Sequence, residues 1–368
     1  MLPRGPIALA CCLALAWLVP SPSRAAALVG VNVVNPQWQP RGRQDATLDA
    51  LREAGVRLIR VPLLPPTGGA YEDAVDYVAR AAARGLDVLL VVYPQYRPDA
   101  AARPAVPSEP EMWQLPPLSA ADPDLLTATY GPFFRRLDTR GLALAGIEFG
   151  NEINWTAFNG EFPIPGEGRI LGDRDLAEHP VGRRIAAGFR AYLRSLAALR
   201  RLRDNLVANR RTPLLAAGFS DFGPPGPSPW GRSLDGVGLA ATLRFLRAGG
   251  LDALVDGYSL HTYPEAGATP AARAAAFARD ALAACSLGKP CWITEWGFPE
   301  PDLGCAADDR RRAALVEEFR DLVRPAVADG RIRGLVYYAW DGAGDPHALL
   351  RCGRLRASGR AALAPFGP

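Results

Sequence analysis

The sequence predicts a single α/β domain in which eight parallel strands close into a (β/α)8 TIM barrel with long loops at the strand ends. Short apolar runs alternate with amphipathic stretches along the chain, as expected for successive βα units. The 368 residues leave room for the roughly 250 residues of such a barrel plus insertions. No glycine-rich phosphate-binding motif follows the first strand, which removes the usual support for an open nucleotide-binding sheet.

Each predicted strand is a short run rich in Val, Ile, Leu or Phe and bounded by Gly, Pro or charged residues. The third run is apolar almost throughout, which is typical of a sheet that is covered on both faces. The predicted strands cover residues 28–34, 56–63, 86–93, 142–149, 213–217, 254–260, 291–294 and 332–339.

The segments between these runs show apolar residues at helical spacing. Predicted helices cover residues 46–54, 71–84, 124–137, 182–205, 237–248, 271–284 and 306–328, and the last helix of the chain is expected to be short. The connections 94–118, 154–180 and 220–235 are long and rich in Pro, Gly and aromatic residues. Each follows a strand, and a barrel enzyme shapes its substrate groove on that face.

The first 25 residues have the features of an export signal. Arg4 supplies a positive charge, residues 7–19 are apolar but too few to span a bilayer comfortably, and small residues around Ala25 suit cleavage. An uncleaved anchor is the alternative. We therefore expect a mature domain of residues 26–368 that is secreted or periplasmic, monomeric and without stable membrane insertion. The net charge of +4 is spread along the chain, so nucleic acid is not an expected partner.

Export changes the interpretation of the cysteines, because they enter an oxidising compartment. Four of the six cysteines remain after signal removal, and four cysteines allow three pairings. We favour Cys285–Cys291, across the loop before the seventh strand, and Cys305–Cys352, which joins the loops after the last two strands. A zinc site is the competing interpretation, but CxxC spacing is missing and the chain has three histidines. We therefore expect no metal.

Two glutamates lie at the ends of predicted strands. Glu152 follows Asn151 at the end of the fourth strand, and Glu295 lies directly after the seventh. The carboxyl ends of barrel strands converge on one mouth, so we expect the two carboxylates to meet there. A lone glutamate in this position would more often be simply solvated. Two well-placed carboxyl groups, however, can break a glycosidic bond without a metal or a cofactor.

Over essentially the whole mature chain, the order of strand-end motifs resembles the clan A glycoside hydrolases, and most of all the family 5 cellulase and mannanase group. The motifs are Arg60 on the second strand, Asn151-Glu152 on the fourth, His261 and Tyr263 on the sixth, Glu295 on the seventh and Trp340 on the eighth. One departure is Ile153, which stands where family 5 enzymes usually have a proline. It leaves the subfamily and the sugar open.

The resemblance implies a retaining β-glycoside hydrolase that acts on a β-linked poly- or oligosaccharide through a glycosyl-enzyme intermediate. In that mechanism a carboxylic acid protonates the leaving oxygen, while a carboxylate roughly 5–5.5 Å away attacks the anomeric carbon. The resemblance assigns Glu152 as acid/base and Glu295 as nucleophile. Two alternatives keep the same residues: a transglycosylase, and a non-catalytic carbohydrate-binding barrel of an exopolysaccharide system.

The same resemblance implies roles for the neighbouring residues. Asn151 would bind the sugar 2-hydroxyl, and His261 would line the same subsite. Arg60 would lie close to Glu295 and keep it ionised, with a structural ion pair as the alternative role. Tyr263 would hold the nucleophile by a hydrogen bond. The acid/base glutamate must be protonated when it acts, so its pocket should be drier or more negative than that of the nucleophile.

Aromatic residues are expected to stack on the C–H faces of sugar rings. The resemblance makes Trp340 the platform of the cleavage subsite. Trp155, Trp113 and Trp230 lie in or next to long loops and would form further subsites, with packing inside the loops as the alternative.

Three other residues near these motifs have different expected roles. Glu148 lies four residues before the acid/base glutamate on the same strand and should be buried and structural. Trp292 should face away from Glu295 by strand alternation and belong to the core. Asp341 would either bind substrate or cap a helix.

Overall fold

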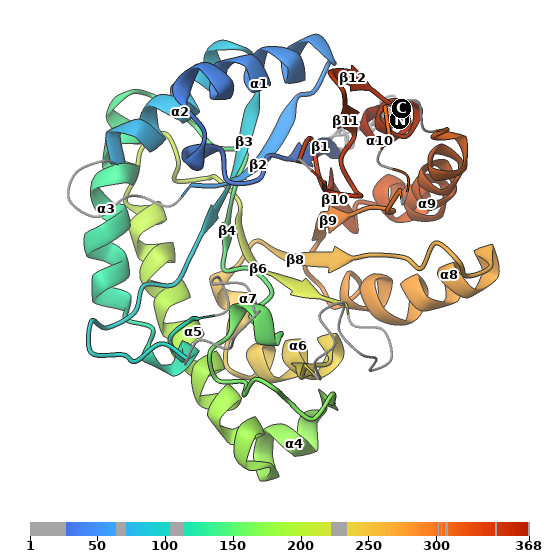
Figure 1. Cartoon of the computed structure of the whole chain (residues 1–368). Coiled ribbons are helices and arrows are strands. Elements are labelled where there is room, and N and C mark those ends of the chain that lie inside the picture. The colour runs from blue at the N-terminus through green and yellow to red at the C-terminus, as the bar shows by residue number, and fades with distance from the viewer. Residues whose placement is uncertain are drawn as a thin grey trace, which may run out of the picture.

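The computed structural model describes residues 27–63, 71–103, 114–221, 234–300, 302, 304–305, 308–342 and 344–366. Eight parallel strands close into a barrel in the order β1-β10-β9-β8-β6-β4-β3-β2, and helices lie around it (Figure 1). The predicted (β/α)8 fold is confirmed. The predicted signal lies outside the described residues. Among the helices that are described, none has the length and apolarity required to cross a membrane.

All eight predicted strands are present, with small differences at their ends. They are β1 (Leu28–Asn32), β2 (Leu58–Pro62), β3 (Asp87–Val92), β4 (Gly146–Phe149), β6 (Leu214–Ser220), β8 (Gly257–Thr262), β9 (Cys291–Trp296) and β10 (Ile332–Tyr337). Two small sheets lie outside the barrel. They pair β5 (Ile170–Leu171) with β7 (Gly236–Val237), and β11 (Leu350–Arg351) with β12 (Arg354–Leu355).

Two of the helices begin at a side-chain cap. Asp122 accepts hydrogen bonds from the N–H groups of Asp124 and Leu125, and Thr269 accepts one from Ala272; a proline follows each of these two caps. The α-helices are α1 (Arg41–Glu53), α2 (Tyr71–Ala83), α3 (Pro123–Thr139), α4 (Asp173–Glu178), α5 (Pro180–Asp204), α6 (Leu239–Ala248), α7 (Leu251–Leu254), α8 (Pro270–Phe277), α9 (Arg310–Ala328) and α10 (Ala357–Leu363).

The interior of the barrel changes from apolar to polar toward its carboxyl end. A cluster of buried side chains fills the lower part: Leu58, Leu89, Leu215, Trp292 and Val336. A Cβ at Gly334 would collide with the Trp292 ring, so glycine makes room for the indole. Side chains two positions further along a strand point the same way, which places Arg60 and Thr294 above this layer. The polar groups therefore rest on an apolar floor beneath the mouth.

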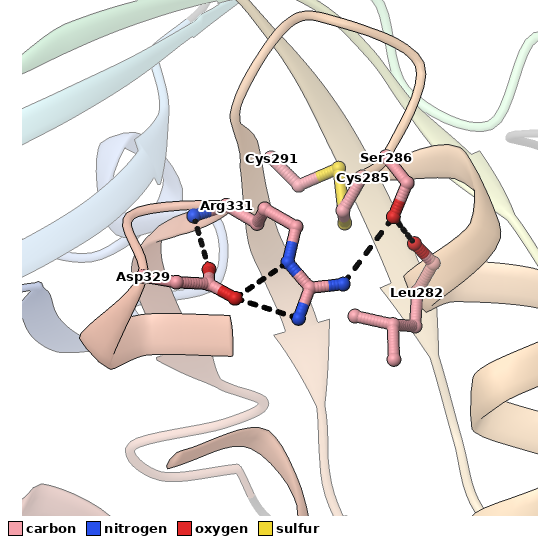
Figure 2. The surroundings of a disulfide bond; sticks show 6 residues. All are labelled: Leu282, Cys285, Ser286, Cys291, Asp329 and Arg331. Atoms are coloured by element: carbon pink, nitrogen blue, oxygen red, sulfur yellow. Dashed lines mark hydrogen bonds and ion pairs between the residues drawn. A yellow bond between two sulfur atoms is a disulfide. The ribbon is translucent and has the colours of Figure 1, made fainter. Parts of the chain in front are cut away.

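Two disulfides join the cysteines in the favoured pairing. The Cα atoms are 5.1 Å apart in Cys285–Cys291 and 5.7 Å apart in Cys305–Cys352. The first closes the loop that precedes β9, where Arg331 donates to Ser286 Oγ at 3.3 Å (Figure 2). The second joins the chain after β9 to the β11–β12 hairpin.

Candidate active site

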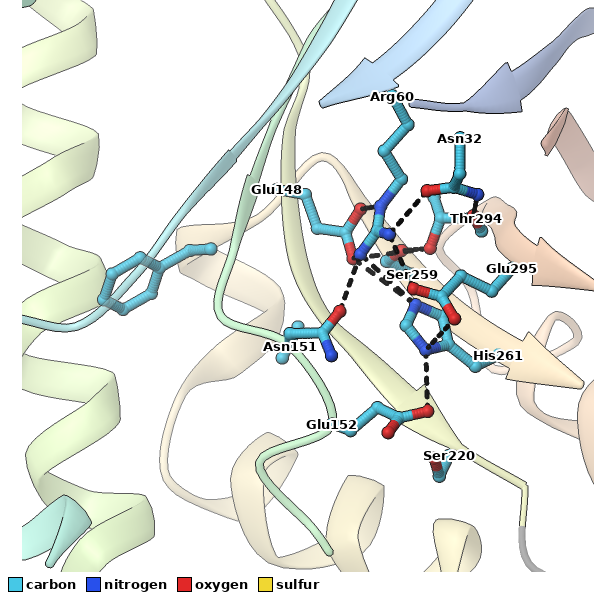
Figure 3. A network of polar contacts seen from close by, with 12 residues as sticks. Asn32, Arg60, Glu148, Asn151, Glu152, Ser220, Ser259, His261, Thr294 and Glu295 are labelled. Carbon is cyan, nitrogen blue, oxygen red and sulfur yellow. Dashed lines mark hydrogen bonds and ion pairs between the residues drawn. The ribbon is translucent and has the colours of Figure 1, made fainter. Parts of the chain in front are cut away.

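Arg60 is the centre of a buried polar network at the mouth of the barrel (Figure 3). Its Nε and Nη2 donate to the two oxygens of Glu148 at 2.8 and 3.0 Å. Its Nη1 donates to Glu295 Oε1 at 2.7 Å and to Asn32 Oδ1 at 2.8 Å. Nη2 also donates to Asn151 Oδ1 at 2.8 Å. Burial alone would lower the pKa of Arg60, but the two carboxylates raise it above its ordinary value.

Glu148 is fully buried, as expected for a structural residue. Burial alone would raise the pKa of Glu148, but the charge of Arg60 and a hydrogen bond to His261 outweigh it and lower the pKa to about 2. Thr294 Oγ1 also donates to this carboxylate at 3.3 Å. Glu148 is therefore an anion that fixes Arg60 from below.

The fold brings Glu152 and Glu295 together on either side of His261. The imidazole Nδ1 lies 2.9 Å from Glu152 Oε1 and 3.5 Å from Glu295 Oε2. One oxygen of each glutamate and one ring nitrogen all lie within 4.8 Å of one another. The three groups are thus close enough to hold a cation. The adjacent Arg60 already supplies positive charge to this site, however, which weakens the case for a metal.

His261 is held in place by its neighbours. A Cβ at Gly218 on β6 would collide with the imidazole, so the ring position depends on glycine there. Burial alone would lower the pKa of His261, but Glu295, Glu148 and Glu152 raise it to about 9. The ring therefore carries a proton at neutral pH. Its Nε2 lies 3.8 Å from Glu148 and 3.4 Å from Arg60, and the anion offsets the two positive charges.

The backbone at Glu152 has an uncommon conformation. Its φ of 42° lies in the left-handed region, two residues after Gly150 with a φ of 88°. The N–H of Glu152 donates to Gly218 O at 2.9 Å, which holds this turn against β6. A left-handed conformation costs a non-glycine residue roughly 1–2 kcal/mol, and such strain concentrates at functional positions.

The two glutamates differ in their partners more than in their burial. Glu152 is 8% exposed and Glu295 is 9% exposed, so burial does not separate the two pockets, and the expected difference, a drier or more negative pocket for Glu152, can lie only in the neighbouring charges. The hydroxyl of Tyr263 donates to Glu295 Oε2 at 2.7 Å, while Arg60 binds the other oxygen. Desolvation of its hydroxyl and the charge of the Glu295 carboxylate raise the pKa of Tyr263 well above its ordinary value, although the residue as a whole is exposed, so the hydroxyl remains a neutral donor. Glu295 therefore receives two strong donors, and Glu152 contacts His261.

Both carboxylates open into a cleft of about 700 Å³. Its lining includes Asn151 and Trp155, two of the residues for which sugar binding is predicted. The Asn151 oxygen binds Arg60, so its Nδ2 is left to donate to a ligand. Trp113 and Trp230 lie outside the described residues.

The prediction for Trp340 is wrong. Its side chain is 1% exposed and belongs to the main apolar core. Strand β10 ends at Tyr337, and the following chain is held between neighbours: the N–H of Trp340 donates to Asn32 O, and the N–H of Leu350 donates to Trp340 O. These backbone bonds place the ring in the core. Tyr338 lines the cleft instead.

Three residues of the site were missed by sequence reasoning. Asn32 ends β1 and its side-chain amide bridges Arg60 to the Thr294 carbonyl; a polar residue at the end of an apolar strand could have indicated it. Tyr338 and His347 form a wall of the cleft beside Tyr263, with ring centroids 6.3 and 5.4 Å from the Tyr263 ring. His347 lies beyond the last barrel strand, where no strand pattern points to it.

The sequence matches no family model and no curated protein. Solved structures do share the fold. The β-glycosidase BGL167 is 17% identical with a TM-score of 0.56, over 91% of this chain and 95% of that one. The virulence factor SghA, solved with its substrate analog salicin, is 14% identical with a TM-score of 0.53, over 91% and 94%. The endo-β-1,4-mannanase from Thermotoga petrophila is 13% identical with a TM-score of 0.50, over 92% and 76%. The resemblance to clan A glycoside hydrolases is confirmed at the level of the fold.

Proposed function

We propose that this protein is a retaining β-glycoside hydrolase with Glu295 as nucleophile and Glu152 as acid/base. The observation that supports this most is the unequal treatment of two adjacent carboxylates. Arg60 and Tyr263 each donate to one oxygen of Glu295, which favours its charged form and fixes its orientation. Glu152 lies on the other side of His261 and has that ring as its one hydrogen-bond partner among the described side chains, so it receives fewer donors than Glu295. A nucleophile and a proton donor need this difference.

The proposed reaction has two steps. Glu295 attacks the anomeric carbon while Glu152 gives its proton to the leaving glycosidic oxygen, so the C–O bond breaks as the glycosyl ester forms. A water molecule then gives a proton to Glu152 and attacks the same carbon, which releases Glu295 and retains the configuration. Asn151 Nδ2 is available to bind the 2-hydroxyl in the transition state. His261 Nδ1 lies close enough to exchange a proton with Glu152.

The substrate class we propose is a β-linked poly- or oligosaccharide. The cleft of about 700 Å³ lies within the range of ligand pockets, roughly 300–1,000 Å³. Trp155, Tyr263 and Tyr338 offer it aromatic surface, which suits the C–H faces of sugar rings. The names of structural neighbours point the same way, since they include a β-glycosidase and a β-1,4-mannanase.

The first test is the release of reducing sugar from β-glucans, β-mannans, β-galactans, xylans and bacterial exopolysaccharides. Wild-type protein should hydrolyse at least one of them, and Glu295→Gln and Glu152→Gln should each lose at least about a thousandfold in rate. Glu53→Gln, at an exposed glutamate of α1, is the matched control and should retain full rate. Full activity in Glu295→Gln would exclude the mechanism. Longer products at high substrate concentration would indicate transglycosylation, and binding without turnover a non-catalytic barrel.

A further inference from the structure

A second hollow lies beside the catalytic cleft, on the same face of the barrel. It has a volume of about 650 Å³ and lies between the β1–α1 connection, α2 and the β11–β12 hairpin. Its lining begins at Val33, directly after Asn32 of the catalytic network, and includes Asp341, three residues after Tyr338. Among the described residues, it shares no lining residue with the catalytic cleft. The two hollows are therefore neighbours with separate walls.

Trp38 forms an exposed aromatic surface at this hollow. Its side chain is 69% exposed, and it lies in a short 3-10 turn (Pro36–Trp38) between β1 and α1. Among the described residues, the large apolar side chains that are exposed include two aromatic ones, Trp38 and Tyr263. Tyr263 belongs to the catalytic cleft. An indole left in water at the edge of a hollow is typical of a surface that binds a ligand.

Three polar residues, Arg43, Tyr77 and Asp341, belong to the lining of the hollow, and their side chains have few partners among the described residues. The hydroxyl of Tyr77 is buried without a hydrogen bond, in a residue that is 2% exposed. Asp341 is half-buried, and the structure gives its carboxylate no ion pair with a described residue. Arg43 is an exposed residue of the same lining. Burial raises the pKa of Asp341, and the charge of Arg43 opposes this effect. A partly buried carboxylate without a hydrogen-bond partner costs free energy, which a ligand hydroxyl bound to Asp341 would recover.

The β11–β12 hairpin, which forms part of the lining, is anchored by a disulfide. Cys352 and Gly353 of the β11–β12 hairpin line the hollow, and the Cys305–Cys352 disulfide anchors that hairpin to the chain after β9. The N–H of Leu350 also donates to Trp340 O, which fixes the hairpin to the chain that follows β10 (Figure 1). A pre-formed wall lowers the entropy cost of binding.

We propose that this hollow is a second carbohydrate-binding site, in which Trp38 stacks on a neutral pyranose and Asp341 and Arg43 bind its hydroxyls. The choice of a neutral sugar follows from the charges, because a carboxylate and a guanidinium face the same space and balance each other. The choice of a carbohydrate rests on the proposed function. A long substrate would bind this site as well as the catalytic cleft. Of the two roles expected for Asp341, the proposal favours substrate binding over helix capping.

The test observes the two sites separately in one protein. The Glu295→Gln variant, labelled with ¹⁵N-tryptophan, is titrated with hexaoses of β-1,4-glucose, β-1,4-mannose, β-1,4-galactose, β-1,4-xylose and β-1,3-glucose. The indole N–H signals of Trp38 and Trp155 are identified by their loss in Trp38→Phe and Trp155→Phe. We expect at least one sugar to shift the Trp38 signal in a saturable manner. Adding Asp341→Asn should raise the dissociation constant measured at the Trp38 signal by about tenfold or more. The dissociation constant measured at the Trp155 signal should stay the same.

Each outcome decides between the two proposals. A Trp38 signal that none of the five sugars shifts, or a Trp38 response that Asp341→Asn leaves unchanged, overturns the second site. Shifts at Trp155 alone, with hydrolysis by the wild type, overturn the second site and leave the proposed hydrolase standing. Shifts at Trp38 without hydrolysis of any sugar support the second site and contradict the hydrolase. Val207→Ala, at an exposed apolar residue outside both hollows, is the control and should leave both constants unchanged.

Discussion

At the scale of single residues, strand-end chemistry could be predicted from the sequence, but side-chain direction beyond a strand could not. Glu152 and Glu295 converge because both lie at carboxyl ends of barrel strands. The same rule predicts that Trp340 lies at the mouth of the barrel. It lies in the core instead, because its strand ends three residues earlier. The alternation of side chains cannot separate Trp340 from Tyr338, since the two are an even number of residues apart.

Arg60 should be essential for stability as well as for activity. It neutralises the buried Glu148 and contacts Glu295, so Arg60→Met leaves two carboxylates without their cation. We expect a loss of about 3–5 kcal/mol in the free energy of unfolding, measured by urea titration. Adding Glu148→Gln removes one of the unpaired charges and should restore part of the stability but not the activity. Unchanged stability in Arg60→Met would show that the network is not the support we infer.

His261 should make stability depend on pH in the alkaline range. Burial alone would lower the pKa of His261, but the surrounding carboxylates outweigh this effect and raise the pKa from 6.5 to about 9. Its stabilising contribution is therefore fully present below pH 6.5 and is lost as the pH rises through about 9. We expect the wild type to lose more unfolding free energy than His261→Gln between pH 6.5 and 9.5. Parallel pH profiles for the two proteins would contradict a proton held on this ring.

At the scale of elements, the alternating apolar pattern was sufficient to predict all eight barrel strands. It was not sufficient to predict how β9 presents its residues. Strict alternation would place Trp292 and Glu295 on opposite faces, but the pairing with β8 shifts from Leu260–Ile293 to His261–Glu295. Thr294 is the extra residue of this bulge, and both Thr294 and Glu295 reach the polar network. A bulge depends on the neighbouring strand, so a single strand's sequence does not reveal it.

Two glycine substitutions form a matched pair, one in the apolar floor of the barrel and one on helix α1. Gly334→Ala brings a methyl group into the Trp292 ring and should cost about 1–3 kcal/mol through overpacking. Gly42→Ala lies in α1 with open space around the new methyl group, so it should stabilise the protein by about 0.5–1 kcal/mol. Thermal unfolding of the two variants should therefore shift in opposite directions. A neutral Gly334→Ala would show that the floor is loosely packed.

At the scale of the whole molecule, the closed barrel brings together the candidate catalytic residues and their hydrogen-bond partners from distant parts of the chain. The network around Arg60 uses residues of β1, β2, β4, β8 and β9, so the site exists only when the barrel is closed. The two disulfides lie outside this network and stabilise connections after β8 and β9. They suit a protein that folds in an oxidising compartment, which agrees with the export that we propose from the first 25 residues.

Mass spectrometry of the exported protein tests the disulfides and the signal together. The intact mass should correspond to a chain that begins near residue 26 and lacks four hydrogens, because each disulfide removes two. Peptide mapping without reduction should recover Cys285 joined to Cys291, and Cys305 joined to Cys352. Four free thiols, or an N-terminus at Met1, would refute the proposed export and oxidation.

The identity of the nucleophile can be tested directly by covalent trapping. Wild-type protein is incubated with activated 2-deoxy-2-fluoro β-glycosides of glucose, mannose, galactose and xylose, and the labelled peptide is sequenced by mass spectrometry. We predict one fluoroglycosyl group on Glu295, labelling that persists in Glu152→Gln because the leaving group needs no acid, and no labelling in Glu295→Gln. A label on any other residue, or hydrolysis of a β-glycoside with inverted configuration, would contradict the proposed mechanism.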